Sequence, residues 1–206
     1  MSDPNNGAGL TREMLDALFQ DAHTTHTFSS DPVDPAAIAA VYEDLRWAPT
    51  QMNSQPLRLT LVESSEAKDR LSPHMRPGNR DKTRAAPMTV IAAWDPNWHT
   101  YLPLLAPHRE GGRKKLESDP AARCEIGQRS ALLQIGYLML GLRAHGLHVG
   151  PMTGFNATGV DEEFHARTGW KTEVIINVGW KPHADDPKAV RFRAGRLSFD
   201  DACQRV

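Results

Sequence analysis

The chain has 206 residues, of which 40% are hydrophobic and 24% are charged, and its formal net charge is −1. This composition is typical of a globular protein, and the balanced charge argues against a nucleic-acid-binding function. The longest apolar run is far shorter than the ~20 residues that span a bilayer. The N-terminus lacks the features of a secretory signal, and two cysteines are too few for a disulfide framework. We therefore expect a cytoplasmic protein without a membrane span.

The first nine residues are rich in Gly, Asn, Asp and Pro, a composition that predicts disorder over 1–9. No repeat or linker divides the remainder, so we expect one domain over 10–206. Apolar residues at helical spacing predict a first helix from Leu10 to Phe19, with Thr11 as its N-cap.

A second helix is predicted between residues 34 and 48, because Asp34 is a suitable N-cap and Pro35 suits the first turn. The polar, proline-bracketed segment 49–56 that follows is typical of irregular structure. Alternation of leucines with polar residues then predicts a half-buried strand over 57–63.

Further along, we predict a short helix over 66–71 and a buried strand over 87–94. Residues 95–120 are rich in proline and glycine and form a loop-rich excursion, which is typical of a lid. The strongest helix signal covers 121–144. Its segment 131–142 is apolar on nearly every side, which predicts burial in the core or at a subunit contact.

A last buried strand is predicted over 173–180, followed by a tail with a short amphipathic piece. Long helices are thus interspersed with three or four strands, without a regular βαβ rhythm. This order favours an α+β fold over a doubly wound sheet.

The sequence contains neither a G-x-S-x-G nucleophile elbow nor a Walker A segment. Two H-x-x-H pairs occur, His23–His26 and His145–His148. A pair of histidines without a third converging ligand seldom holds zinc. We therefore predict no metal site and expect these histidines near helix ends.

Three polar segments have the residue types of a cofactor cradle. The amides and hydroxyls of 49–56 can bond a heteroaromatic ring edge, and the glycines of 150–155 let backbone approach a flat ligand. Arg191, Arg193 and Arg196 can supply guanidinium forks for a phosphate. Each segment also has a simpler interpretation: a helix-to-strand turn, a glycine turn and a solvated basic tail.

Taken in order and spacing, these segments resemble the nitroreductase family of FMN-dependent oxidoreductases, from about Leu15 to the C-terminus. The resemblance rests on Pro49-Thr50-x-x-Asn53-Ser54-Gln55-Pro56, on Gly150-Pro151-Met152-Thr153-Gly154-Phe155, on the late arginines, and on the long helix ending in Ala144-His145-Gly146-Leu147. It implies a central, mostly antiparallel sheet flanked by helices. It also implies a homodimer with the long buried helix at the interface, with two FMN sites there and NADH or NADPH as co-substrate.

The resemblance also implies which residues bind the cofactor. They are His23, Thr24, His26, Pro49, Thr50, Met52, Asn53, Asn79, Pro151, Met152, Thr153, Gly154, Arg193 and Arg196. The segment His23–His26 departs from the family, which usually has arginines there, so phosphate binding must depend on Arg193 and Arg196. The segment from Thr50 to Asn53 is expected to reach the flavin of the partner subunit.

Within the family, Ala93-Trp94-Asp95, Leu102-Pro103-Leu104-Leu105 and Arg196-Leu197-Ser198-Phe199 resemble the malonic semialdehyde reductase (3-hydroxypropanoate dehydrogenase) branch of pyrimidine catabolism. The expected reaction is reduction of malonic semialdehyde to 3-hydroxypropanoate. Arg58 is a candidate for the substrate carboxylate, with a solvent-facing strand residue as the alternative, and no catalytic acid or base is nominated. The alternatives are a broad nitroreductase or quinone reductase, a flavin-binding protein without turnover, and a helical interaction protein without flavin.

Overall fold

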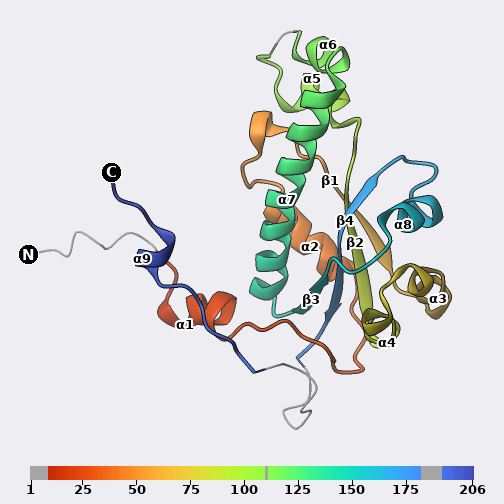
Figure 1. Ribbon diagram of the computed structural model, residues 1–206, viewed down its shortest axis with the longest axis vertical. Helices are drawn as coiled ribbons and strands as arrows, with labels where there is room; N and C mark the ends of the chain where they lie inside the picture. The colour runs from red at the N-terminus through yellow and green to blue at the C-terminus, as the bar shows by residue number, and fades with distance from the viewer. Residues whose placement is uncertain (1–8, 110, 182–191) are drawn as a thin grey trace, which may run out of the picture.

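The computed structural model describes residues 9–109, 111–181 and 192–206. The described strands form one four-stranded antiparallel sheet in the order β1-β2-β4-β3. The strands are β1 Leu57–Val62, β2 Met88–Trp94, β3 His148–Met152 and β4 Lys171–Gly179. The predicted α+β class with an antiparallel sheet flanked by helices is confirmed (Figure 1).

The α-helices are α1 Arg12–Leu15, α2 Pro35–Leu45, α3 Ser65–Leu71, α4 Pro77–Ala85, α5 Leu102–Leu105, α6 Gly112–Glu117, α7 Pro120–Ala144, α8 Ala157–Phe164 and α9 Phe199–Ala202. Of these, α2 and α7 cover one face of the sheet, and α3 and α8 cover the other. The other helical segments are the π-helix η1 Asp16–Gln20 and the 3-10 helices η2 Gln51–Asn53, η3 Ser72–His74 and η4 Trp98–Tyr101.

The main core lies between the sheet and the pair α2 and α7. On α2, Asp34 accepts a hydrogen bond from the amide of Ala36 (2.8 Å) and Pro35 occupies the first turn, as predicted. The residues of this core include Ile38, Val41, Val90, Ala92, Leu138, Leu142, Ile176 and Val178. This core holds α7 against the sheet and so fixes the positions of both ends of α7 relative to the surrounding loops.

The opposite face of the sheet packs against α3 and α8, seen on the other side of the strands in Figure 1. Here Ile91 of β2 and Ile175 of β4 contact Leu71 and Val160. Successive side chains of a strand point to opposite faces, so β2, which is buried along its whole length, contributes to both cores.

The excursion over 95–120 contains more helix than the sequence predicts. It forms η4, α5 and α6 around a small core of its own, made of Trp98, Leu102, Ala106 and Leu116. Its base is tight, because a Cβ on Gly127 of α7 would lie 2.7 Å from the Trp98 indole nitrogen. The cluster also packs against Met52 and against Ala122 and Ile126 of α7.

Several boundaries also differ from expectation. The first helix is only α1 and then η1, although Thr11 caps it as predicted. Residues 150–152 of the predicted loop 150–155 belong to β3. Pro151 is tolerated there because β3 is an edge strand of the sheet. Helices α4 and α8 were not predicted at all. The predicted disorder of 1–9 lies almost wholly outside the described residues.

The described residues leave one side of α7 exposed. Leu132 is 48% exposed and Leu133 46% exposed, and a Cβ on Gly136 would meet nothing within 4 Å. Helix α1 and the C-terminal segment 192–206 with α9 lie to one side of the sheet and its helices (Figure 1). Across the described parts of the chain, no helix is long and apolar enough to cross a membrane.

A buried polar network joins α8, β4 and β1. His165 is 1% exposed, its Nε2 lies 3.0 Å from Oγ1 of Thr60, and its Nδ1 lies 3.4 Å from Oγ1 of Thr172. Thr172 also donates from its hydroxyl to Oδ1 of Asp161 (2.7 Å). Burial lowers the pKa of His165, an effect that Asp161 partly opposes. The folded protein therefore favours the neutral imidazole.

Stability is therefore expected to fall as the pH drops below about 6.5, the ordinary histidine value. A histidine whose folded pKa is lowered contributes its full stability above the unfolded pKa and loses it as the pH falls through that value. Burial lowers the pKa of His99 and His148 in the same direction. The melting temperature, measured between about pH 8 and 5, should decline less steeply in His165→Gln than in the parent. The exposed His108→Gln is the control, and equal slopes in His165→Gln and parent would contradict the prediction.

Candidate functional site

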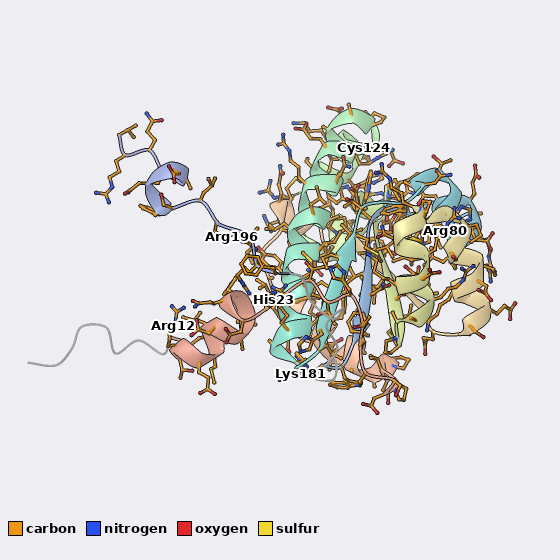
Figure 2. The ribbon with its side chains drawn as sticks, turned by 60° about the horizontal axis from the view of Figure 1, so that its bottom comes forward. Arg12, His23, Arg80, Cys124, Lys181 and Arg196 are labelled. Atoms are coloured by element: carbon orange, nitrogen blue, oxygen red, sulfur yellow. The ribbon has the colours of Figure 1, made fainter. Side chains whose placement is uncertain are left out.

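A cavity of about 500 Å³ lies between the N-terminal segment, the end of α7 and the C-terminal tail. We call it the cationic pocket. Its lining is Phe19, Ala22, His23, Thr24, His26, Arg143, Phe192, Arg193, Ala194 and Arg196. Figure 2 shows His23 and Arg196 on the two segments that meet there. The structure thus brings together five of the residues predicted to bind the cofactor.

The N-terminal wall of this pocket is attached to β3. The amide of Thr25 donates to the carbonyl of Val149 (2.9 Å). A Cβ on Gly150 would lie only 2.4 Å from the carbonyl oxygen of Thr25, so no side chain fits there. Glycine at this position allows His23 and His26 to lie beside the sheet.

The arginines of the tail differ in how firmly they are held. Arg193 is half-buried and its Nη2 donates to the carbonyl of Ala22 (3.0 Å), which fixes the side chain across the pocket. Arg196 is exposed and its Nη1 donates to the carbonyls of Ala194 and Gly195. Arg191, the third predicted arginine, lies outside the described residues.

The far end of β3 leads to a second group of predicted residues. Beyond Met152, the carbonyl of Gly154 accepts hydrogen bonds from Nδ2 of Asn79 (3.1 Å) and from the amide of Arg76 (3.0 Å). Pro151, Met152 and Gly154 are half-buried, and Thr153 is exposed. Asn79 and the 151–154 segment therefore lie in contact, and β3 connects them to the cationic pocket.

The predicted cofactor loop 49–56 lies elsewhere, against the excursion. Met52, Asn53 and Gln55 have positive φ angles of 60°, 51° and 41°, a conformation that non-glycine residues adopt only under constraint. The constraint comes from the excursion: Asn53 donates from Nδ2 to the carbonyl of Leu105 (2.8 Å), and Met52 packs on the Trp98 cluster. Neither Pro49 nor Thr50 lines the cationic pocket of its own chain.

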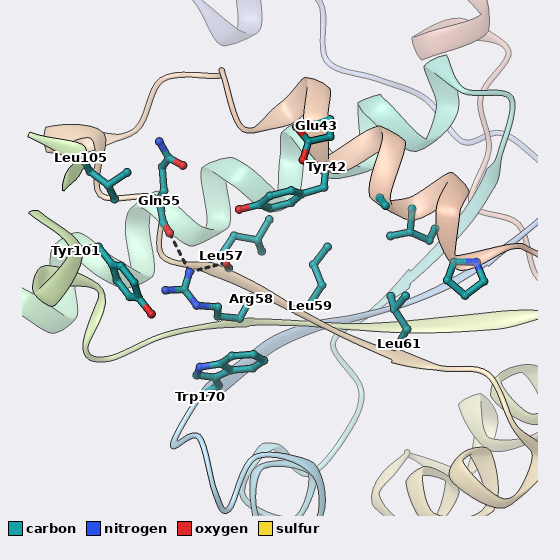
Figure 3. A pocket seen from close by; sticks show the side chains of 13 residues that line it. Tyr42, Glu43, Gln55, Leu57, Arg58, Leu59, Leu61, Tyr101, Leu105 and Trp170 are labelled. Carbon is teal, nitrogen blue, oxygen red and sulfur yellow. Dashed lines mark hydrogen bonds between the residues drawn. The ribbon is translucent and has the colours of Figure 1, made fainter.

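Arg58, the predicted carboxylate ligand, already has partners. Its Nη2 donates to Oδ2 of Asp95 (2.9 Å). Its Nη1 donates to the carbonyls of Gln55 and Leu57, as the dashed lines in Figure 3 show. The Tyr101 ring lies 5.3 Å from the guanidinium carbon. Since these partners use much of its donor capacity, Arg58 is placed to hold the 49–56 loop. It borders a largely apolar groove of about 570 Å³ between α2 and β1.

One charged residue that lines the cationic pocket was not predicted from the sequence. Arg143 is in the last turn of α7, where a basic side chain is common because it complements the helix dipole, so nothing marked it as special. Burial, and then the charge of Arg193, lower the pKa of Arg143. No group of three or more His, Cys, Asp and Glu side chains in the described ranges is arranged to hold a metal.

Comparison with known proteins identifies the family of the chain. Residues 20–180 match the nitroreductase family. The chain is 42% identical to a protein of Leptothrix cholodnii with the provisional name NADH dehydrogenase/NAD(P)H nitroreductase, over 92% of this chain and 94% of that protein. A protein of the same provisional name from Streptomyces coelicolor is 40% identical over 90% of both chains.

Solved structures share the fold. A provisionally named nitroreductase from Exiguobacterium sibiricum, in complex with FMN, superposes with a TM-score of 0.80 at 16% identity, over 96% of this chain and 99% of that one. A nitroreductase family protein from Streptococcus pneumoniae gives a TM-score of 0.74 at 21% identity, over 92% and 98% of the two chains. With the family match covering most of its length, this chain belongs to the nitroreductase family.

Proposed function

We propose that this protein is an NAD(P)H-dependent oxidoreductase that holds FMN along β3. The observation that carries the proposal is the connection of two sites by one strand. A cationic pocket lies beside the start of β3, and the Asn79–Gly154 contact lies beyond its end. The names of the two relatives above, with NAD(P)H and nitroreductase in them, support the same activity.

The residues present fit FMN. Arginine forks suit a phosphate, and Arg193 is held across the pocket with donors left over. In this proposal, that end is completed by His23, Thr24, His26 and Arg196, and the ring is contacted by Pro151, Met152, Thr153, Gly154 and Asn79. When bound, the flavin supplies the hydride chemistry. The chain's own contribution is to hold the phosphate, orient the ring and keep its face open to an acceptor.

The proposal includes a homodimer in which Pro49, Thr50, Met52 and Asn53 reach the cofactor of the other copy. The uncovered side of α7 around Leu132 and Leu133 supports it, because exposed apolar surface of this kind marks an interface. Leu197 and Phe199 of the extended tail are also exposed, at 79% and 67%. Light scattering of the flavin-loaded chain should give the mass of two copies, and the mass of one copy would contradict this part of the proposal.

For the acceptor, we propose malonic semialdehyde, reduced to 3-hydroxypropanoate, on the strength of the branch resemblance. The second candidate is a broad nitro- or quinone reductase, which the relatives' names favour. The two candidates differ in whether the site must bind a carboxylate. Because Arg58 is paired with Asp95, a substrate carboxylate would have to compete with that contact or find another cation.

The test compares kcat/KM for malonic semialdehyde, propanal and a nitroarene, with NADH and NADPH in turn. An active site whose cation pairs with the substrate carboxylate should disfavour propanal. Propanal has no carboxylate, so that cation would be left desolvated and unpaired. If propanal matches malonic semialdehyde, or the nitroarene greatly exceeds it, the broad reductase is correct. A chain that stays colourless with added FMN would contradict both candidates.

A further inference from the structure

One guanidinium of the cationic pocket, that of Arg143, comes from helix α7 rather than from the C-terminal tail. Arg143 ends α7 and lines both the cationic pocket and an adjoining cavity of about 340 Å³. Its Nη1 donates to the carbonyl of Leu18 (3.0 Å), which fixes the side chain. An arginine has five N–H donors, so most of those on Arg143 remain for a ligand.

Arg143 and Arg193 are two like charges placed together. Both are half-buried, and they are close enough for Arg193 to disfavour the charged form of Arg143. Asp21 lines the adjoining cavity. Nevertheless, no carboxylate within the described ranges comes within 4.0 Å of the charged nitrogens of either arginine. Burying two unpaired guanidiniums together costs free energy unless an anion lies between them.

The remaining neighbours add little negative charge. His148 contacts the same cavity, and burial together with the charges of Lys181 and Arg143 lowers its pKa, so it favours the neutral form. A phosphate monoester carries a charge close to −2 at neutral pH and presents three acceptor oxygens. Two arginine forks match that ligand in both charge and donor geometry.

We propose that Arg143 and Arg193 form a two-guanidinium site for a phosphate monoester dianion, with Arg143 as the fixed half. This rests on the proposed function, in which the monoester is the ribityl phosphate of FMN. The fixed half sits on α7 and the other half on the tail, so binding of the phosphate ties the tail to the body of the protein.

The experiment uses the full chain after its flavin has been removed by dialysis, titrated separately with FMN and riboflavin and followed by flavin fluorescence. Riboflavin has the same ring without the phosphate. Arg143→Gln is the test variant, because glutamine retains a donor for the Leu18 carbonyl. Arg129→Gln is the matched control: it removes an arginine of the same helix that is 72% exposed and paired with Glu125.

We expect Arg143→Gln to weaken FMN binding by at least about tenfold and riboflavin binding by less than about threefold. Arg129→Gln should change neither, and Arg143→Lys should recover part of the loss. An equal loss for both flavins, or no loss for FMN, overturns the proposal, since the first indicates a general structural defect and the second no phosphate contact.

Inorganic phosphate separates this proposal from the proposed function. It should raise the melting temperature of the flavin-free parent, relative to chloride at the same ionic strength, and have a smaller effect on Arg143→Gln. If the parent binds neither flavin, the proposed function fails. The rise in melting temperature with inorganic phosphate still tests whether Arg143 and Arg193 form an anion site. Equal stabilisation of the parent and Arg143→Gln by phosphate overturns the site.

Discussion

Replacing Arg193 with alanine should lower the affinity for FMN by more than an order of magnitude. Arg193 crosses the cationic pocket and is held by the carbonyl of Ala22, so its free donors are already oriented before a phosphate arrives. Loss of a guanidinium fork to a partly buried phosphate costs on the order of 2–4 kcal/mol. The dissociation constant from flavin fluorescence, and FMN retention after dialysis, both measure this loss.

Arg196→Ala is expected to act in the same direction but less strongly. Its guanidinium is exposed and bonded to the carbonyls of its own loop, and solvent screens an exposed charge. Arg205→Ala removes an exposed arginine of the same tail and is the control. The assignment of the phosphate end fails if Arg193→Ala and Arg196→Ala both retain FMN as the parent does.

The elements with strong local signals were predictable from the sequence. Asp34 and Pro35 define the start of α2, and the apolar spacing of α7 gives its length to within one residue at its start. In contrast, α4 has a single buried residue, Thr83, and so shows no apolar period to detect. Helix α8 is short and contains Gly159, which is required because a Cβ there would lie 2.3 Å from the His74 ring.

The candidate site was only partly predictable, because its parts meet through tertiary structure. The H-x-x-H pair at His23 and the tail arginines are far apart in sequence, and the resemblance to a family linked them before any geometry did. Arg143 resembled an ordinary helix-ending residue. The pairing of Arg58 with Asp95 was also missed: Arg58 lies on β1 and Asp95 directly follows β2, and neighbouring strands bring such residues together without a local signal.

Replacing Arg58 with alanine should destabilise the protein by about 2–3 kcal/mol and displace the 49–56 loop. The side chains of Arg58 and Asp95 are only 19% and 10% exposed, so the substitution leaves a mostly buried carboxylate without its cation. It also removes the donor to the Gln55 carbonyl (3.1 Å), at a residue whose positive φ needs support. Denaturant unfolding measures the stability.

A double-mutant cycle separates the coupling energy of the Arg58–Asp95 ion pair from the other effects of each substitution. Arg58→Ala combined with Asp95→Ala should cost less than the sum of the two single changes, because the double variant leaves no unpaired charge. Additive losses would show that the pair carries no coupling. Exposed Arg84→Ala, which breaks a surface pair with Asp69, is the control and should cost less than about 1 kcal/mol.

The kinetics of Arg58→Ala then decide between the two roles considered for this residue. If Arg58 positions the loop, kcat/KM should fall by the same factor for malonic semialdehyde, propanal and a nitroarene, because the loop in the proposed dimer contacts the cofactor and not the acceptor. If Arg58 binds the substrate carboxylate, as the sequence predicted, the loss should be confined to malonic semialdehyde. The three donor contacts of its guanidinium favour the uniform loss, and a loss confined to the acid would return Arg58 to the substrate site.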